Sequence, residues 1–499
     1  MRFNYSSTAR KSKRSQSALE YMMTYGWAIL IIVIVAVILY SMGIFNPSSS
    51  VTFTSSGFSP FTVSSSLCNN LGYKIAIIAG PIPNNANSLT INKVYLTSAT
   101  GANTTTASYT LTNPVTLKSG QSATILIPNV ACNSANTHYS LSAKIQYSYT
   151  ASTLGLQNVN TTGTVAGTSI TGKPSTLTSY EPITITNTQS SATPSPFQQM
   201  VNFTSSDPGF SSIATGNFGQ NVEFFYYNGT IIPSWLENYT STNGLWWLKI
   251  AAIPGGSSET VYLGFAPVSA NLFNTVNDGE APQIPCGSTP TSSCSNYAEY
   301  DDGANVFPEL YNNFAGTTTN AFSGGTYTID NGITVEDNGD MNSISQIPDT
   351  NTAVTIFGLF DSGGASQVGD GYALGYDFVD GFGATGLILN INNNNLYCLN
   401  YAANKSYGAV MAINKTGYYS LYSIYKPDNL TTEFYFNHKF QCEGSWFNGN
   451  NVYNSFSPTS QFQFYAQVSS AAYEYWQYIF ARSLPPNTIM PFVSFGSVA

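Results

Sequence analysis

The sequence predicts a mainly β protein with one apolar helix near its N-terminus. A run that has no charged side chain and is rich in aliphatic residues extends from Tyr21 to Phe45. Beyond it, short segments rich in Thr, Tyr, Phe, Val and Ile alternate with Gly, Asn, Pro and Ser, which is typical of strands joined by turns. The 499 residues are enough for about three domains after the helix. We expect these domains to be β-sandwiches.

The apolar run follows a strongly basic leader, residues 1–15. Five of the chain's 16 Lys and Arg residues lie in this leader, which contains no Asp or Glu. A positive cluster beside an apolar segment stays in the cytosol, and roughly 20 apolar residues span a bilayer. We therefore expect residues 16–45 to cross a membrane with their C-terminal end outside. The basic residues of the leader are Arg2, Arg10, Lys11, Lys13 and Arg14.

The segment KRSQSALEY (13–21) resembles the cleavage region of archaeal type IV prepilins, which carry a class III signal peptide. The resemblance implies that a prepilin peptidase cuts between Ser15 and Gln16 and leaves the helix on the mature protein. It also implies that Glu20 neutralises the terminal amine of a neighbouring pilin subunit in a filament core. A carboxylate at the edge of the lipid is costly without such a partner. The alternative is a plain signal anchor, with Glu20 in the headgroup layer.

The charge balance excludes one class of partner. Loss of the leader's five positive charges changes the formal net charge from −9 to −14, and an acidic protein is not expected to bind nucleic acid. Charged residues make up 8% of the chain, against roughly 25% in ordinary soluble proteins. Sparse carboxylates suit an acidic habitat, because a dense acidic surface loses its native interactions as the pH falls.

Uncharged polar groups and attached glycans are then expected to keep the protein soluble. Several N-x-[ST] sequons follow the helix, and each alone is a weak signal in a chain rich in Asn, Ser and Thr. Their asparagines are Asn103, Asn160, Asn202, Asn228, Asn238, Asn404, Asn414 and Asn429.

The six cysteines point to disulfides in an oxidising exterior. Six cysteines allow 15 pairings, of which the simplest joins neighbours in the sequence. A Cys and His metal site is the rival, but the chain has no C-x-x-C and only two histidines, His138 and His438. The expected pairs are Cys68 with Cys132, Cys286 with Cys294, and Cys398 with Cys442.

Residues 46–175 form the first expected domain. Alternating segments at 74–79, 88–96, 122–128 and 139–149 predict strands with one buried face. The domain resembles the globular part of archaeal pilins, and the resemblance implies an immunoglobulin-like sandwich. A β-sandwich of no special role is the alternative. The polar segment TGKPSTLTS that follows predicts a linker.

Residues 176–280 form the second expected domain. The phrases at 181–189, 221–254 and 255–266 resemble the domain of unknown function 2341 family, which often accompanies sugar-binding modules. Flat aromatic rings stack on sugars, but they also fill sandwich cores. Because alternation sends Trp246 and Trp247 to opposite faces of a strand, we expect one of them to be exposed if one face of the sheet is solvated. The candidates for stacking on carbohydrate are Trp235, Trp246 and Trp247.

Residues 281–499 form the third expected domain. The phrases at 297–317 and 474–497 resemble the concanavalin A-like, LamG-type jelly-roll sandwich, with plain strands such as 352–361 between them. The resemblance implies carbohydrate binding, often beside a structural Ca²⁺. Three aspartates in a Gly-rich stretch could donate oxygens to Ca²⁺, or simply stabilise turns. They are Asp370, Asp377 and Asp380.

Enzymatic activity is not expected. Glycosidases generally need two carboxylates that flank the bond, and the E-x-D-x-E strand of the polysaccharide-cutting members of this fold is missing. A Ser-His-Asp triad would need one of the two histidines as its base. The leading hypothesis is a minor or tip pilin-like subunit, or adhesin, at the cell surface that presents a carbohydrate-binding head. The alternatives are a solitary membrane-anchored lectin-like protein and an anchored glycan hydrolase.

Overall fold

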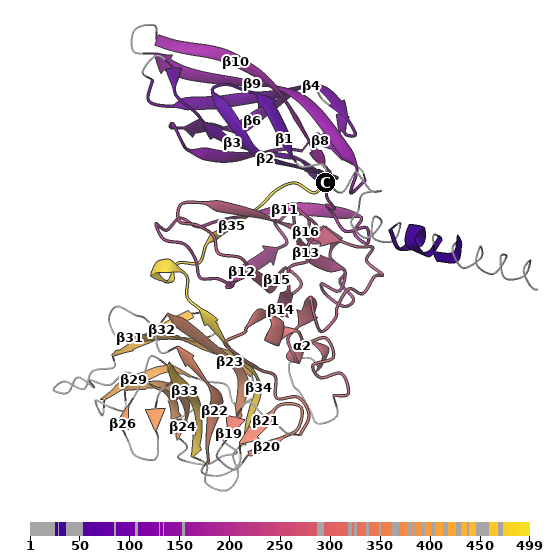
Figure 1. The fold of residues 1–499 in the computed structure, drawn as a ribbon. Helices are drawn as coiled ribbons and strands as arrows, with labels where there is room; N and C mark the ends of the chain where they lie inside the picture. The colour runs from indigo at the N-terminus through magenta and orange to yellow at the C-terminus, as the bar shows by residue number, and fades with distance from the viewer. Residues whose placement is uncertain are drawn as a thin grey trace, which may run out of the picture. The chain divides into compact units, whose positions relative to one another are not determined.

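The computed structural model is mainly β and divides the chain into two compact units, Met1–Gly172 and Lys173–Ala499 (Figure 1). The boundary lies in the linker that the sequence predicts. The structure describes residues 25–27, 29–35, 53–83, 86–104, 108–128, 130–132, 134–151, 155–286, 294–317, 322–323, 327–335, 339–348, 351–361, 369–374, 376–377, 382–383, 386–390, 395–400, 405–412, 418–425, 431–436, 439–445, 459–467 and 473–499.

Near the N-terminus, residues 25–27 and 29–35 are helical. Their large apolar side chains are exposed, from Trp27 at 66% to Val35 at 46%. Among the described residues, no helix has the length and hydropathy needed to cross a membrane. The expected processing site at Ser15 and Gln16, and the carboxylate of Glu20, lie outside the described residues.

The first unit is a two-layer antiparallel sandwich. A five-stranded sheet, in the order β1-β10-β9-β4-β6, and a three-stranded sheet, in the order β2-β3-β7, enclose one apolar core. Strands of the first sheet are β1 (Thr54–Gly57), β4 (Leu89–Thr100), β6 (Ser108–Leu117), β9 (His138–Ala151) and β10 (Gly155–Thr168); the second has β2 (Phe61–Asn69), β3 (Gly72–Ala79) and β7 (Ser122–Ile127), and a small ribbon joins β5 (Asn103–Thr104) to β8 (Val130–Ala131).

The first unit has two layers because buried and partly exposed side chains alternate along its strands. In β9, every second side chain from Tyr139 to Tyr147 is buried, and those between them are partly exposed. A strand that alternates in this way places one face against the core. The segments expected as strands are confirmed here as β3, β4, β7 and β9.

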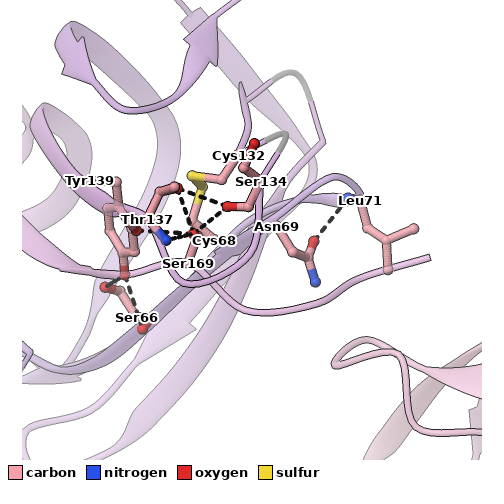
Figure 2. Close-up of a disulfide and its surroundings, with 9 residues drawn as sticks. All are labelled: Ser66, Cys68, Asn69, Leu71, Cys132, Ser134, Thr137, Tyr139 and Ser169. Atoms are coloured by element: carbon pink, nitrogen blue, oxygen red, sulfur yellow. Dashed lines mark hydrogen bonds between the residues drawn. A yellow bond between two sulfur atoms is a disulfide. The ribbon is translucent and has the colours of Figure 1, made fainter. Parts of the chain in front are cut away.

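A buried disulfide closes one end of this sandwich. Cys68, in β2, is bonded to Cys132, which follows β8, as the sequence predicts. Figure 2 shows the polar groups around it: the Ser169 hydroxyl donates to the carbonyls of Ser134 (2.6 Å) and Thr137 (2.9 Å). Backbone hydrogen bonds continue the closure, because the amide of Ile170 donates to the carbonyl of Cys68 at 3.0 Å. The end of β10 is thereby tied to the disulfide.

The second unit begins with a smaller sandwich of two four-stranded sheets. Their orders are β13-β16-β11-β35 and β12-β15-β14-β17, and one apolar core lies between them. The strands are β11 (Ser179–Thr186), β12 (Phe197–Thr204), β13 (Val222–Tyr226), β14 (Ser234–Tyr239), β15 (Asn243–Ile250), β16 (Ser258–Phe265), β17 (Asp278–Glu280) and β35 (Phe492–Phe495).

The end of the chain completes this smaller sandwich. Strand β35 pairs antiparallel with β11, with Phe495 opposite Ile183 and Phe492 opposite Thr186 (Figure 1). The last residues of the segment expected as a third domain therefore belong to a sheet that starts near residue 179. Residues 173–499 form one compact unit.

Two larger sheets make up the rest of this unit (Figure 1). One has the order β20-β21-β34-β23-β30-β31-β32, with β18 also paired to β34; the other has the order β19-β22-β33-β24-β27-β28-β29. The bounds in the first are β18 (Leu310–Asn312), β20 (Tyr327–Ile329), β21 (Ile333–Val335), β23 (Thr352–Asp361), β30 (Tyr418–Tyr425), β31 (Thr431–Phe436), β32 (Lys439–Ser445) and β34 (Tyr473–Ser483). Those in the second are β19 (Phe322–Ser323), β22 (Gly339–Pro348), β24 (Gly369–Leu374), β27 (Gly386–Asn390), β28 (Asn395–Asn400), β29 (Lys405–Ala412) and β33 (Thr459–Gln467).

Short elements complete the unit. They are the helices α2 (Gln283–Cys286) and α3 (Gly303–Val306), the 3₁₀ turns η3 (Phe210–Ser212) and η5 (Pro486–Thr488), and the ribbon of β25 (Tyr376–Asp377) and β26 (Phe382–Gly383).

The second expected disulfide, Cys286 with Cys294, is also formed. Cys398 lies in β28 and Cys442 in β32, two strands of different sheets that lie against each other. Their pairing stays a prediction.

The role of β35 in the core of the smaller sandwich can be tested by substitution. Phe495 lies 4.9 Å, centroid to centroid, from the fully buried ring of Phe203. We expect Phe495→Ala to lower the free energy of unfolding by about 2 kcal/mol, less than the roughly 3–5 kcal/mol of a fully buried Phe, because this ring is partly buried. Urea unfolding of the full chain, followed by Trp fluorescence, measures the change.

Phe492 provides the matched control, because it lies in the same short strand and is 66% exposed. Phe492→Ala should change the stability by less than about 0.5 kcal/mol. Equal effects of the two substitutions would contradict a structural role for β35 in this core.

Candidate functional site

A β-bulge in strand β14 shapes a polar pocket. Trp235 lies opposite Trp247 of β15 and Leu236 opposite Trp246, but the next pair joins Asn238 to Leu245. Glu237 is therefore an extra residue in its strand. A bulge of this kind interrupts the alternation of side chains and re-aims them, and both Glu237 and Asn238 line one pocket.

The pocket has a volume of about 560 Å³ and lies between the smaller sandwich and the strands β23, β31 and β34 of the larger sheets. Its volume is within the range of roughly 300–1,000 Å³ that is usual for small-molecule sites. The polar lining residues are Asn202, Glu237, Asn238, Asn243, Thr355, Tyr435, Arg482 and Thr488, and the apolar ones are Met200, Leu245, Trp247, Leu484, Pro485 and Met490.

Two side chains of opposite charge are held in this pocket by one indole ring. The Nε1–H of Trp247 donates to Glu237 Oε2 at 2.7 Å, and the guanidinium carbon of Arg482 lies 4.9 Å from the centre of the same ring system. A cation over an aromatic face is attracted by the π electrons. Both charged residues are almost completely buried, Glu237 at 1% and Arg482 at 8% exposure. The indole therefore orients an acceptor and a donor toward one cavity.

A tyrosine hydroxyl also contacts the carboxylate of Glu237. The hydroxyl of Tyr478 donates to Glu237 Oε1 at 3.4 Å. Burial, together with the charge of Glu237, raises the pKa of Tyr478 well above its usual value, so this hydroxyl remains a donor. The side-chain amide of Gln283 donates to the backbone carbonyl of Glu237. These contacts give the bulge a defined geometry.

The three tryptophans proposed as sugar-stacking platforms are all buried, and that prediction is wrong. Trp235, Trp246 and Trp247 are 0%, 2% and 3% exposed. The sheet β12-β15-β14-β17 is covered on both faces where these tryptophans lie. Trp246 packs in the core between the two four-stranded sheets, while Trp235 and Trp247 pack on the other face against Phe307 of the loop after α3 and Phe480 of β34. Alternation is confirmed for Trp246 and Trp247, but neither ring is free for stacking.

The Ca²⁺ candidates remain untested. Asp370 lies in β24 and Asp377 in β25, while Asp380 is outside the described residues. Within the part of the chain that the structure describes, no three His, Cys, Asp or Glu side chains are placed to hold a metal ion.

A cluster of buried carboxyl groups lies beside β14, on and near the neighbouring strand β17, and the sequence analysis missed it. Strand β17 runs parallel to β14, with Asp278 opposite Ser234 and Glu280 opposite Leu236. Asp302 packs beside this strand, since a Cβ at Gly279 would lie 2.3 Å from its Oδ1. A usable signal existed: five of the chain's 25 acidic residues lie between 278 and 302.

The carboxyl groups of this cluster differ in their hydrogen bonding. Asp301 accepts hydrogen bonds from the indole of Trp235 at 2.8 Å, the backbone amide of Gly303 at 2.9 Å and the amide of Asn313 at 2.8 Å. Neither oxygen of Asp302, which is 1% exposed, has a hydrogen-bond partner among the described residues.

Burial and neighbouring acids raise the pKa values of these groups. For Asp302, burial and then the charges of Asp301 and Asp278 raise the pKa well above its ordinary value. For Asp278 the causes are burial and Glu223. Burial, followed by the charges of Glu299 and Asp301, raises the pKa of Glu280 to about 7.

Comparison with known proteins does not establish a family. No family model matches the chain, so the expected pilin and 2341 families are not supported by this comparison. Over 141 residues the chain is 33% identical to uncharacterised protein 562 of Sulfolobus islandicus rod-shaped virus 1, a match that covers 27% of this chain. The chain thus spans 22% of the length of the curated relative that it matches.

Several solved structures show a weak similarity. An endo-β-1,3-glucanase from Pyrococcus furiosus is 10% identical with a TM-score of 0.28, covering 35% of this chain and 93% of its own. A carbohydrate-binding module from Bacillus subtilis is 11% identical with a TM-score of 0.25, covering 34% of this chain and 100% of its own. At these TM-scores the similarity says nothing about what this chain binds or catalyses.

The carboxyl cluster predicts that stability falls as the pH rises. Because the folded chain binds protons at Asp278, Glu280 and Asp302 more tightly than the unfolded chain, their contribution to stability is complete below about pH 4, the ordinary pKa of a carboxyl group. It is lost as the pH rises through the folded pKa, about 7 for Glu280. We expect a higher melting temperature at pH 5 than at pH 8, measured by calorimetry.

Asp302→Asn should reduce the difference between the two melting temperatures, because it removes one of these titrating groups without changing the side-chain shape. The exposed Asp330→Asn is the control and should leave the difference unchanged. A wild-type protein that is more stable at pH 8 than at pH 5 would contradict the prediction.

Proposed function

We propose that this protein is a cell-surface carbohydrate-binding protein, and that the pocket built around Glu237, Trp247 and Arg482 is its binding site. The observation that carries the proposal is the placement of a carboxylate, a guanidinium and three asparagines around one cavity. Sugar hydroxyls both donate and accept hydrogen bonds. A carboxylate accepts them, a guanidinium donates them and an asparagine amide does both.

The apolar part of the pocket fits the same class of ligand. Met200, Leu245 and Met490 supply apolar surface beside the polar groups. A sugar ring presents C–H groups on its faces, and such groups pack against apolar side chains. A pocket of about 560 Å³ suits a mono- or disaccharide rather than a long polysaccharide.

The number of carboxylic acids that line the pocket favours binding over hydrolysis. Among the lining residues in the described part of the chain, Glu237 is the only carboxylic acid. Glycosidases generally need a second carboxylate, roughly 5–9.5 Å from the first. Glu237 is also engaged by Trp247 and Tyr478. Release of reducing sugar from a bound glycan would favour the anchored hydrolase instead.

Substitution of Glu237 tests the site. Glu237→Gln keeps the size of the side chain and removes a charged acceptor, so we expect sugar binding to weaken about ten-fold, which corresponds to about 1.4 kcal/mol. A glycan array identifies the strongest ligand, and isothermal titration calorimetry measures its affinity for both proteins.

The control for this substitution is Glu259→Gln, a change of the same kind in β16 that does not line the pocket. Near-UV circular dichroism checks that both variants keep the wild-type packing. Equal affinities of the three proteins would place the ligand elsewhere.

We further propose that the N-terminal helix anchors the protein as a pilin-like subunit. The side chains from Ile29 to Val35 are 46% to 66% exposed, and this apolar surface is unfavourable in water. Lipid before assembly, and the helices of neighbouring subunits afterwards, would cover it. Two disulfides support an exterior location for the units that follow. The partners of this proposal are a membrane, a prepilin peptidase and other pilin subunits.

The mature N-terminus tests this anchor. Cleavage by a prepilin peptidase between Ser15 and Gln16 should leave Gln16 as the first residue, and mass spectrometry of the protein from its native membrane identifies it. A protein that still begins at Met1 would favour the solitary anchor, and a first residue after Phe45 would mean that the helix is removed.

A further inference from the structure

In the part of the chain that the structure describes, the sequon asparagines are exposed or half-buried. Asn103, Asn160, Asn202 and Asn228 are exposed and Asn238 is half-buried. In contrast, some asparagines that do not belong to sequons are fully buried among hydrogen-bond partners, such as Asn69, Asn187 and Asn221. Within the described residues, no sequon asparagine is buried.

Two of these sequons meet at the pocket. Asn202 lies on β12, an edge strand, and Asn238 lies near the end of β14, directly after the bulge. Both face Leu245 of β15, which runs between them. Neighbouring strands are about 4.8 Å apart, so the two asparagines lie roughly 10 Å apart across the sheet. Both line the pocket.

We propose that N-linked glycans on Asn202 and Asn238 control access to the pocket. The proposal rests on the carbohydrate-binding function proposed above and adds its regulation. In the modification, the Nδ2 of each asparagine forms a bond to C1 of a lipid-linked oligosaccharide. The bond between C1 and the lipid phosphate breaks, the lipid phosphate leaves, and the amide loses one proton.

The local hydrogen bonding tolerates this change. The amide of Asn243 donates to Asn202 Oδ1 at 3.4 Å, and Oδ1 remains an acceptor when a sugar is attached to Nδ2. The bulge brings Asn238 to the same pocket as Glu237. A sugar attached at either position therefore begins beside the polar groups that would bind a free sugar.

An attached glycan competes strongly with a free ligand. A group held by a short flexible linker has an effective concentration on the order of millimolar near its site. A free sugar that binds with a dissociation constant in the same range must then displace it. If the attached glycan binds the pocket with a dissociation constant of about 0.1 mM, this competition raises the apparent dissociation constant of every free sugar about ten-fold.

The experiment compares the full chain made in a host that adds N-linked glycans with the chain made in a host that does not. Glycopeptide mass spectrometry measures occupancy at each sequon. Calorimetry measures binding of glucose, galactose, mannose, N-acetylglucosamine and glucuronic acid. We expect Asn202 and Asn238 to be occupied, and the glycosylated protein to bind its best sugar at least ten-fold more weakly than the unglycosylated protein.

Sequon variants separate the glycan from the asparagine side chain. Thr204→Ala with Thr240→Ala removes both sequons and keeps Asn202 and Asn238 in the pocket, so it should restore binding in the glycosylating host. Thr204→Ser with Thr240→Ser keeps the sequons and should bind as weakly as the glycosylated wild type. Thr230→Ala removes only the Asn228 sequon, whose asparagine does not line the pocket, and should restore nothing.

Three outcomes would overturn the proposal, and they do so in two different ways. Unmodified Asn202 and Asn238 in the exported protein, or equal binding by the glycosylated and unglycosylated forms, would overturn the role of the glycans alone. An unglycosylated protein that binds none of the sugars would overturn the carbohydrate-binding function as well.

Discussion

The second unit depends on a sheet that is buried on both faces. Strands β12, β15, β14 and β17 pack against the other small sheet on one side and against β34 and the loop after α3 on the other. Such a sheet cannot follow the usual pattern of one apolar and one polar face. Two consecutive tryptophans in β15 fit a sheet that is covered on both faces, because Trp246 lies in one core and Trp247 in the other. The pocket lies where the bulge at Glu237 and the neighbouring residues of β12 and β15 face strands β23, β31 and β34.

Charged residues make up 8% of the chain, so each buried charged group contributes a large share of the electrostatic energy. Burial of an ionised group is costly unless it is paired or hydrogen-bonded. At the pocket, the Trp247 indole offsets this cost for both charged groups. Its N–H donates a hydrogen bond to Glu237, and its ring makes a cation–π contact with Arg482. In the cluster beside β14, burial and neighbouring acids raise the pKa values of Asp278 and Asp302 well above their ordinary range, which favours the neutral carboxyl groups. Strand β14 therefore lies beside both groups of charges, the hydrogen-bonded carboxylate at its bulge and the carboxyl cluster next to β17.

Strands and disulfides could be predicted because they depend on local patterns. Alternation in β9, the apolar run of β23 and the neighbour pairing of Cys68 with Cys132 all agree with the structure. The site could not be predicted in the same way. Met200, Glu237 and Arg482 are far apart in the sequence, and nothing in the sequence near any of them signals the others. The tryptophans were assigned to stacking because a single strand does not reveal whether its second face is covered.

The sequence by itself determined the β class, the apolar N-terminal segment, the pairing of two pairs of neighbouring cysteines and the positions of the sequons, because each depends on residue type and order along the chain. Only the tertiary structure decided that β35 returns to pair with β11, that Trp235 and Trp247 are core residues, and that Asn202 and Asn238 share a pocket. The physical reason is that these outcomes depend on which surfaces cover one another. Burial of that kind is a property of packed layers and not of any one segment.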